Sequence, residues 1–318
     1  MREPVRVATR DRLPQLSGGR PFLTDGGLET SLTFQQRIDL PCFAAFPLAT
    51  DEAGREALTR YFEPFLALAR ERGAGFVLDT PTWRANPDWA AQLGYSREAL
   101  ADANRDGVEL AERLRAGADG TSVVISGAVG PRGDGYVAGE LMSADEAERY
   151  HSAQIGTFAD TAVDMIGALT LTYAEEAVGI VRAAAAADIP VVVSFTVETD
   201  GRLPSGQSLG EAIRQVDAET DGAAAYFMIN CAHPTHFSDV LERGDGWLSR
   251  IGGLRANASA KSHAELDDAE ELDDGDPVEL GAQHAELRPL LPEVRVLGGC
   301  CGTDHRHVAE INRAWEDE

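Results

Sequence analysis

Lysine is nearly missing from this sequence of 318 residues. Lys261 is the only lysine, and arginine supplies the other basic side chains. Asp and Glu outnumber Lys and Arg by 53 to 28, which gives a formal net charge of −25. Nucleic-acid phosphates require a basic face, so this balance argues against a nucleic-acid partner. Two origins fit the acidic, lysine-poor composition: adaptation to high salt, which screens self-repulsion, or an arginine-rich coding bias.

Long hydrophobic runs are missing as well. No stretch of about 18 apolar residues occurs, so we expect no membrane-spanning helix and no membrane partner. The segment Met1–Arg6 has mixed charge and lacks the apolar region of a secretory signal. We therefore expect a cytoplasmic protein.

Cysteine is scarce, and four residues are too few to form a disulfide framework in a chain of this length. Cys300 and Cys301 are adjacent and follow an apolar run that ends in two glycines, and Cys231 follows another apolar run. Adjacent cysteines seldom bond to each other because disulfide geometry is specific. The pattern favours metal or redox chemistry, and we expect Cys42 to be an inert, buried side chain.

Apolar, β-rich runs recur along the chain with helical segments between them. Eight such β-then-α units over roughly 300 residues predict a (β/α)8 barrel, in which residues 1–318 form one domain and residues 1–19 are an N-terminal extension. The continuous apolar strands agree with a parallel sheet covered on both faces. A doubly wound sheet is the alternative, although neither Gly-x-Gly-x-x-Gly nor a Walker-type loop is present. The predicted strands are residues 21–25, 75–80, 122–129, 164–170, 189–196, 224–230, 249–255 and 294–297.

Helix signals separate these strands. Residues 51–72 place apolar side chains at the spacing of a single helix face. Ser96 is an N-cap for a helix that runs to about residue 116, and Ser143 with Glu146 forms a capping-box pattern. Residues 173–187 and 208–220 are also predicted to be helical.

An acidic segment, residues 264–279, lies between the seventh and eighth predicted strands. Its carboxylates lack the ligand spacing of a calcium loop. We predict a solvated loop and a short helix there.

In a barrel of this type the loops at the carboxyl ends of the strands form the active site. Cys231, Cys300 and Cys301 should therefore converge, which predicts an open three-cysteine zinc site. The glycines that flank the adjacent pair permit the bend that directs both thiols towards one ion. The other strand ends expected on this face are Asp25, Thr80, Gly127, Leu169 and Thr196.

Two competing interpretations of these motifs are open. Cys231, His233 and His236 have the spacing of metal ligands, but this set leaves the cysteine pair unexplained, and we interpret both histidines as structural. We interpret His305 and His307 as residues at the start of a helix. The Gly-Gly pairs of the seventh and eighth strands suit the phosphate site common in such barrels, although a phosphate needs no thiol.

The ligand set itself indicates a type of chemistry. Three thiolates on Zn²⁺ leave one open position and a net charge of about −1. Such an ion polarises a carbonyl poorly, because its charge is already neutralised. It is well suited to holding a substrate thiol as a nucleophilic thiolate, since the metal lowers the pKa of that thiol. Thiol alkylation is therefore favoured over hydrolysis.

Three segments resemble signatures of the homocysteine S-methyltransferase family: Thr24–Thr30, Asn230–Cys231 and Gly298–Gly302. They occur in the order of the family and cover nearly the whole chain. The resemblance implies a (β/α)8 barrel whose zinc is held by the three cysteines. It also implies transfer of a methyl group from a small donor, of the S-methylmethionine, S-adenosylmethionine or betaine type, to homocysteine, which gives methionine.

The same resemblance implies a set of substrate contacts. Asp25 would help to bind the amino group of homocysteine. Aromatic side chains would enclose the methyl group of a betaine donor through cation–π contact, and the candidates are Trp83, Phe43 and Tyr226. The implied substrate-binding residues are Asp25, Gly26, Thr80 and Asn230.

One position departs from the pattern of the betaine-type members. Where they have a glutamate that binds the amino group, the alignment places Leu169. Loss of that partner should weaken ammonium binding by about 1.5–3 kcal/mol. Either Glu198 takes over this contact, or the thiol is not homocysteine. Glu175 and Glu176 lie further into the following helix and are predicted to face solvent.

Two further functions are alternatives to a homocysteine methyltransferase. The first is methyl transfer to a different thiol, which the substitution at Leu169 suggests. The second is a non-catalytic zinc-binding barrel that serves as an interaction module. For the enzyme, the predicted partners are a small-molecule thiol and a methyl donor, and an oligomer is possible.

Overall fold

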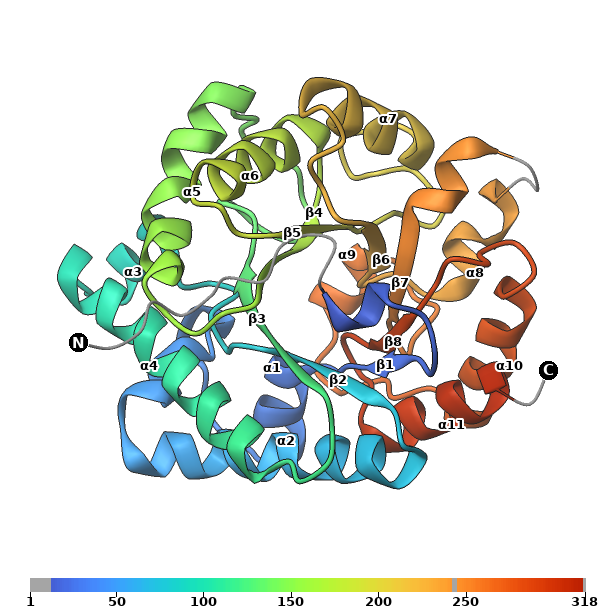
Figure 1. Cartoon of the computed structure of the whole chain (residues 1–318), viewed down its shortest axis with the longest axis horizontal. Coiled ribbons are helices and arrows are strands. Elements are labelled where there is room, and N and C mark those ends of the chain that lie inside the picture. The colour runs from blue at the N-terminus through green and yellow to red at the C-terminus, as the bar shows by residue number, and fades with distance from the viewer. Residues whose placement is uncertain (1–12, 242–244, 317–318) are drawn as a thin grey trace.

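The computed structural model describes residues 13–241 and 245–316. In these residues eight parallel strands close into one barrel in the order β1 to β8, and helices surround it (Figure 1). The predicted (β/α)8 fold is confirmed, and the doubly wound alternative is wrong because β1 pairs with β8. The strands are β1 Phe22–Leu23, β2 Gly75–Asp79, β3 Val123–Val129, β4 Met165–Leu171, β5 Val191–Phe195, β6 Phe227–Asn230, β7 Ile251–Ala256 and β8 Val296–Gly299.

The five long helices predicted between the strands are present, and each begins within one residue of its predicted start. Asp51 accepts a hydrogen bond of 2.8 Å from the N–H of Gly54, and Gly73, with a φ of 60°, ends the same helix. Ser143 and Ser208 each form a capping box. None of the helices in the described residues has both the length and the hydropathy needed to cross a bilayer. They are α1 Leu28–Thr30, α2 Glu52–Arg72, α3 Pro87–Gln92, α4 Arg97–Gly117, α5 Ala144–Ala159, α6 Ala174–Ala186, α7 Leu209–Glu219, α8 Pro234–Phe237, α9 His263–Asp267, α10 Pro277–Leu287 and α11 His305–Glu316.

The core has an outer and an inner part. The outer part packs the strands against the helices, and the inner part fills the barrel. Leu13 is fully buried in the inner part, and Gln15 donates hydrogen bonds to Met165 Sδ (3.3 Å) and to the Tyr226 hydroxyl (3.4 Å). Residues 13–16 thus cover the amino ends of the strands. Tyr226 belongs to this interior, so it was wrong to consider it for the methyl-donor cage.

Glycines let the last strands approach their neighbours closely. A Cβ on Gly298 would lie 1.9 Å from Thr24 Oγ1, and one on Gly299 would lie 1.9 Å from Thr303 Oγ1. In β7, Gly252 similarly packs against the ring of Tyr226, and Gly253 packs against the thioether of Met228. Close packing accounts for both Gly-Gly pairs, so they do not require a phosphate site.

Candidate active site

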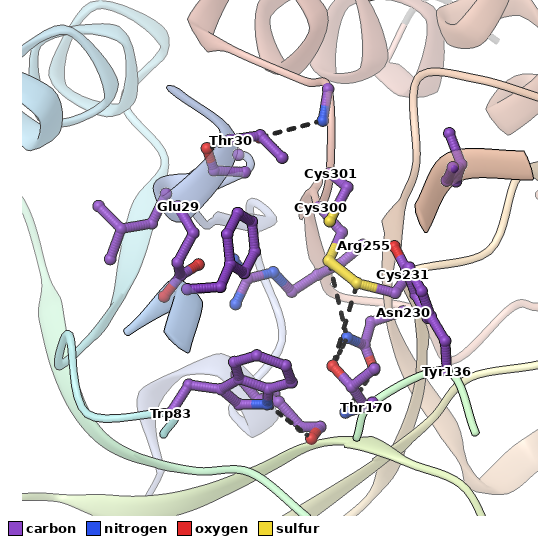
Figure 2. Close-up of a pocket in the computed structure, with 18 of the residues that line it drawn as sticks. Glu29, Thr30, Trp83, Tyr136, Thr170, Asn230, Cys231, Arg255, Cys300 and Cys301 are labelled. Carbon is purple, nitrogen blue, oxygen red and sulfur yellow. Dashed lines mark hydrogen bonds between the residues drawn. A yellow bond between two sulfur atoms is a disulfide. The ribbon is translucent and has the colours of Figure 1, made fainter. Parts of the chain in front are cut away.

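The carboxyl ends of the strands surround a cavity of about 400 Å³ (Figure 2). Its wall includes side chains from the ends of β1, β2, β4, β6, β7 and β8, and from the loops after β3 and β7. All the residues predicted to bind substrate or metal line it: Asp25, Gly26, Thr80, Asn230, Cys231, Cys300 and Cys301. The site is therefore where the barrel topology predicts it.

Three cysteine sulfurs meet at this cavity. The Sγ atoms of Cys231, Cys300 and Cys301 all lie within 4.8 Å of one another. A disulfide joins Cys231 to Cys300, and Cys301 is a free thiol. We expected three thiolates, so this disulfide is a correction: sulfurs that converge on one point are also close enough to bond to each other. Cys42 is half-buried, not buried as expected, and lies outside the cluster.

The donor set fits a thiophilic cation. Sulfurs from two strands lie within reach of one ion, and the adjoining cavity leaves room for a fourth ligand. Burial raises the pKa of the Cys301 thiol to about 11. A bound cation is therefore needed to keep this sulfur as a thiolate at neutral pH, and the disulfide must be reduced before all three sulfurs can ligate.

The Asn230 side chain braces the sulfur cluster from β6. Its Oδ1 accepts hydrogen bonds from the N–H of Thr170 (2.9 Å) and from Ser194 Oγ (2.6 Å). Its Nδ2 donates to Thr170 Oγ1 (2.7 Å) and faces Cys300 Sγ at 3.8 Å. Thr170 has a φ of 62°, and this unusual backbone turns its N–H and hydroxyl towards the amide. Asn230 is thus oriented towards the sulfur, and its contact with substrate stays a prediction.

A second group of side chains holds the backbone of Cys231. Its carbonyl accepts hydrogen bonds from Thr196 Oγ1 (3.1 Å), Asn257 Nδ2 (3.1 Å) and His263 Nε2 (2.9 Å). The His263 ring stacks on Tyr136, with centroids 4.0 Å apart. Such partners fix the orientation of metal ligands. We predicted Thr196 at this face but did not single out Tyr136 or His263.

Arg255 on β7 binds two of the strand-end carboxylates. Its Nη2 donates to Asp25 Oδ1 (2.5 Å), its Nη1 to Asp79 Oδ2, and its Nε to the Gly299 carbonyl (3.1 Å). The Tyr61 hydroxyl donates to Asp25 Oδ2 at 3.0 Å, so both oxygens of Asp25 have partners. Burial raises the pKa of Asp25 to about 6, although Arg255 opposes this shift. Burial lowers the pKa of Arg255, but the two carboxylates outweigh it and raise that pKa above its usual value.

Glu29 is a cavity residue that we did not single out, although it lies inside the Thr24–Thr30 signature. It stands in the short helix α1 and lines the cavity (Figure 2). In the described part of the chain, no side chain forms a hydrogen bond or an ion pair with its carboxylate. Burial raises the pKa of Glu29 to about 7.

The end of β4 is apolar, as the alignment at Leu169 predicted. Leu169 lines the cavity, and its carbonyl accepts a hydrogen bond of 3.1 Å from Trp83 Nε1. Glu198, the suggested substitute, is not among the described residues that line the cavity, and it pairs with His263 Nδ1 at 3.2 Å. Trp83 and Phe43, the other two aromatic candidates, do line it.

Two expectations about this region were wrong. Glu176 was expected to face solvent, but it is 1% exposed where α6 packs on the loop after β3. Hydrogen bonds with His151 Nε2 (2.9 Å) and the N–H of Arg132 (2.7 Å) replace the water that its carboxylate loses. Gly127 was expected at the active face, but β3 continues to residue 129 and Gly127 abuts the ring of Phe158 on the outer side.

The histidines have structural roles, as expected. His233 is the N-cap of α8, and His236 Nε2 hydrogen bonds with the Ala260 carbonyl (2.9 Å). His305 and His307 stand at the start of α11. Among residues 13–241 and 245–316, the three cysteines are the one His, Cys, Asp or Glu cluster with metal-binding proximity.

The acidic segment 264–279 forms one wall of the cavity. The predicted short helix is present as α9, but the loop beyond it does more than face solvent. Among the described residues, seven carboxyl side chains and two guanidinium groups line the cavity, so its charge is strongly negative. The lining residues of this segment are Leu266, Asp267, Ala269, Glu271, Leu272 and Asp273.

Comparisons with known proteins agree with this geometry. A family model described as homocysteine S-methyltransferase matches residues 22–315. The oxidized form of the homocysteine methyltransferase MmuM from Escherichia coli aligns with a TM-score of 0.72 at 19% sequence identity, over 98% of this chain and 99% of that one. Its metallated form aligns with a TM-score of 0.71 at 18% identity and the same coverage. A search of curated proteins gives no match.

At such identities the solved structures show a shared fold, and the family model carries the assignment. It covers the chain from β1 to α11, and it includes all three signature segments. The chain therefore belongs to the homocysteine S-methyltransferase family and is a methyltransferase.

Proposed function

We propose that this protein is a zinc-dependent methyltransferase that methylates the thiol of homocysteine. The methyl donor is a small onium compound of the S-methylmethionine, S-adenosylmethionine or betaine type, and the product is methionine. The convergence of three cysteine sulfurs within 4.8 Å, at the mouth of the barrel, is the observation that carries the proposal. Family membership supports homocysteine as the thiol, and the metallated form of the Escherichia coli protein supports a metal.

Cys231, Cys300 and Cys301 would hold the zinc once the disulfide has been reduced. Zinc bound there would keep the substrate sulfur as a thiolate at neutral pH. The thiol proton leaves to solvent, and the thiolate attacks the methyl carbon in line with the leaving atom. A sulfur–carbon bond forms, the bond from the methyl group to the donor breaks, and the donor keeps that electron pair and loses its positive charge.

The side chains of the barrel position the two substrates. Asn230, which is itself held by Thr170, faces the sulfur of Cys300, and a cavity of about 400 Å³ is large enough for small molecules beside it. Trp83 and Phe43 line the cavity, and in this proposal their rings contact the onium methyl group. Fixing both reactants in line accounts for much of the acceleration expected in such a transfer.

Methyl transfer to a different thiol is the second candidate. It is favoured by Leu169 at the end of β4 and by Asp25, whose two oxygens already have partners. Leu169 has no carboxylate to bind an amino group, and the carboxylate of Asp25 already accepts hydrogen bonds from other side chains. A closed structural zinc site is disfavoured, because the sulfur cluster opens onto the cavity.

Zinc content and zinc X-ray absorption of the reduced protein, with and without homocysteine, test the proposal. We expect one zinc with three sulfurs and one lighter ligand, and four sulfurs after homocysteine is added. If homocysteine leaves the zinc ligands unchanged, methyl transfer to a different thiol is favoured, and other thiols should then be tried. A reduced protein that binds no zinc would contradict both. Methionine formation with a panel of onium donors then identifies the donor.

A further inference from the structure

The carboxylate that was expected to bind the substrate amino group is already engaged. Asp25 is 3% exposed, and its two oxygens accept hydrogen bonds from Arg255 and Tyr61. Asp79, the next strand-end carboxylate, is also paired with Arg255. A charged ligand group would have to displace a buried ion pair to reach either one, which is costly.

Glu29 is differently placed. Glu29 lines the same cavity and is only half-buried. Its carboxylate has no hydrogen-bond or ion-pair partner among the side chains of residues 13–241 and 245–316. In Figure 2 it points into the cavity from the side opposite the three sulfurs, with Trp83 below it. A carboxylate held in a partly desolvated cavity gains strongly from a cation that enters beside it.

The backbone that carries Glu29 is fixed relative to the sulfur cluster. The N–H of Gly302 donates to Thr30 Oγ1 at 3.2 Å, and Thr30 Oγ1 donates to the Gly27 carbonyl at 3.1 Å. A Cβ on Gly27 would lie 2.6 Å from the Cys300 carbonyl, so the two segments are in close contact. The carboxylate therefore stands at a set place across the cavity from the sulfurs.

The rest of the wall also suits a cation. Carboxyl groups outnumber guanidinium groups around the cavity, and Asp267 and Glu271 of the acidic segment lie exposed along it. Such a field concentrates cations at the entrance. Of the two arginines, Arg255 is paired as described, and Arg84 is paired with Asp134. Both arginines attract the Glu29 carboxylate from a distance, but in the described residues neither forms an ion pair with it.

From these observations we propose that the Glu29 carboxylate binds the positively charged group of a substrate and thereby sets substrate specificity. The inference deepens the proposed function and rests on it. The ligand group is an ammonium or onium cation, which has two sources: the α-ammonium of an amino-acid thiol such as homocysteine, or the onium atom of the methyl donor.

Either source predicts an effect on binding more than on the chemical step. An α-ammonium keeps its charge throughout the reaction, so its contact with Glu29 is equally strong in the ground state and the transition state. An onium donor loses charge as the methyl group leaves, so its contact with Glu29 is strongest in the ground state. In both cases removal of the carboxylate raises KM and does not lower kcat.

The test compares Glu29→Gln with Glu63→Gln, a matched loss of charge on the exposed face of α2. Calorimetry at pH 8 on the reduced, zinc-loaded protein measures three probes. Homocysteine and 4-sulfanylbutanoate differ only in the amino group, and dimethylsulfonioacetate is an onium methyl donor without an amino group. Circular dichroism and the unfolding midpoint establish that each variant is folded, and Glu29→Asp, which keeps the charge, should retain part of the affinity.

If Glu29 binds the α-ammonium, wild type prefers homocysteine to 4-sulfanylbutanoate by roughly 10- to 100-fold, and Glu29→Gln loses that preference. If Glu29 binds the donor, Glu29→Gln instead weakens dimethylsulfonioacetate by a similar factor. If Glu29→Gln matches Glu63→Gln with all three probes, the inference is overturned while the proposed function stands. If wild type methylates no thiol but Glu29→Gln still loses binding, the proposed function fails and the role of Glu29 in binding stands.

Discussion

Replacement of Arg255 by methionine should destabilise the barrel strongly at neutral pH. Arg255 is 6% exposed and stands between Asp25 and Asp79, which are 3% and 8% exposed. Methionine has about the same apolar side-chain stem as arginine, so the main effect of the substitution is loss of the positive charge. Two buried carboxylates would then face each other without a counter-charge, and such a loss costs about 3–5 kcal/mol. The free energy of unfolding from urea titrations at pH 7 measures it.

The pH dependence gives this prediction its sign. In wild type the pKa of Asp25 is about 6, above its ordinary value of 3.8, and loss of Arg255 should raise it further. A carboxyl group whose folded pKa is raised destabilises the fold above that pKa, and the penalty is relieved as the pH falls through it. For a further rise of one pKa unit or more, the difference between Arg255→Met and wild type should shrink by about 1 kcal/mol between pH 7 and pH 5.

A repaired variant provides the control. Changing all three side chains, as Arg255→Met with Asp25→Asn and Asp79→Asn, removes the buried charges together and should recover most of the lost stability. A loss below about 1 kcal/mol for Arg255→Met at pH 7 would refute the assumption that this ion pair is dry. A loss that is equal at pH 7 and pH 5 would refute the role assigned to the carboxylates.

Three other predictions concern the sulfur cluster and the core. Gly298→Ala places a Cβ against a threonine hydroxyl, so it should lower the free energy of unfolding by about 1–3 kcal/mol and also lower zinc affinity. The control is Gly156→Ala in α5, where a Cβ has open space and should leave stability unchanged or raise it. Urea and zinc titrations measure both variants. Cys301→Ser should lose zinc measured by metal analysis of the reduced protein, and Cys42→Ser, outside the cluster, should keep it; equal zinc contents would contradict the ligand assignment. Burial lowers the pKa of His284 to about 4, so the folded state loses stability relative to the unfolded state as the pH falls below 6.5. Between pH 7 and pH 4.5, His284→Leu should remove about 2–3 kcal/mol of that loss in the free energy of unfolding. Parallel stability curves for the two proteins would argue against this prediction.

The fold could be predicted from the sequence because a parallel barrel repeats one local signal. Each strand is buried on both faces and therefore appears as an apolar run, and capping residues such as Ser143 mark where the helices begin. The three cysteines follow from the same reasoning, since two strand ends carry them. Their disulfide does not, because oxidation depends on the distance between sulfurs that lie far apart along the chain.

The groups that the sequence did not reveal are those whose environment is set by tertiary contacts. Glu176 has the polarity of a surface residue, and only the packing of α6 on the loop after β3 shows that it is buried. Glu29 lies in the Thr24–Thr30 signature, just beyond the first predicted strand, and Arg255 is the last residue of the seventh predicted strand. The arginine at the end of an apolar strand was a signal, because a buried arginine requires acidic partners, and Asp25 and Asp79 lie at the ends of two other strands.

The contact between Thr30 and Gly302 joins residues that are 272 positions apart. During synthesis the growing chain carries Cys231 long before it carries Cys300 and Cys301, and until β8 is made the strands β1 and β7 have open edges. Insertion of the last strand pairs both edges and delivers two of the three sulfurs at the same moment. Loop closure over such a separation is slow, so it falls late in folding. A product that terminates before β8 thus has neither a closed barrel nor the three-sulfur cluster.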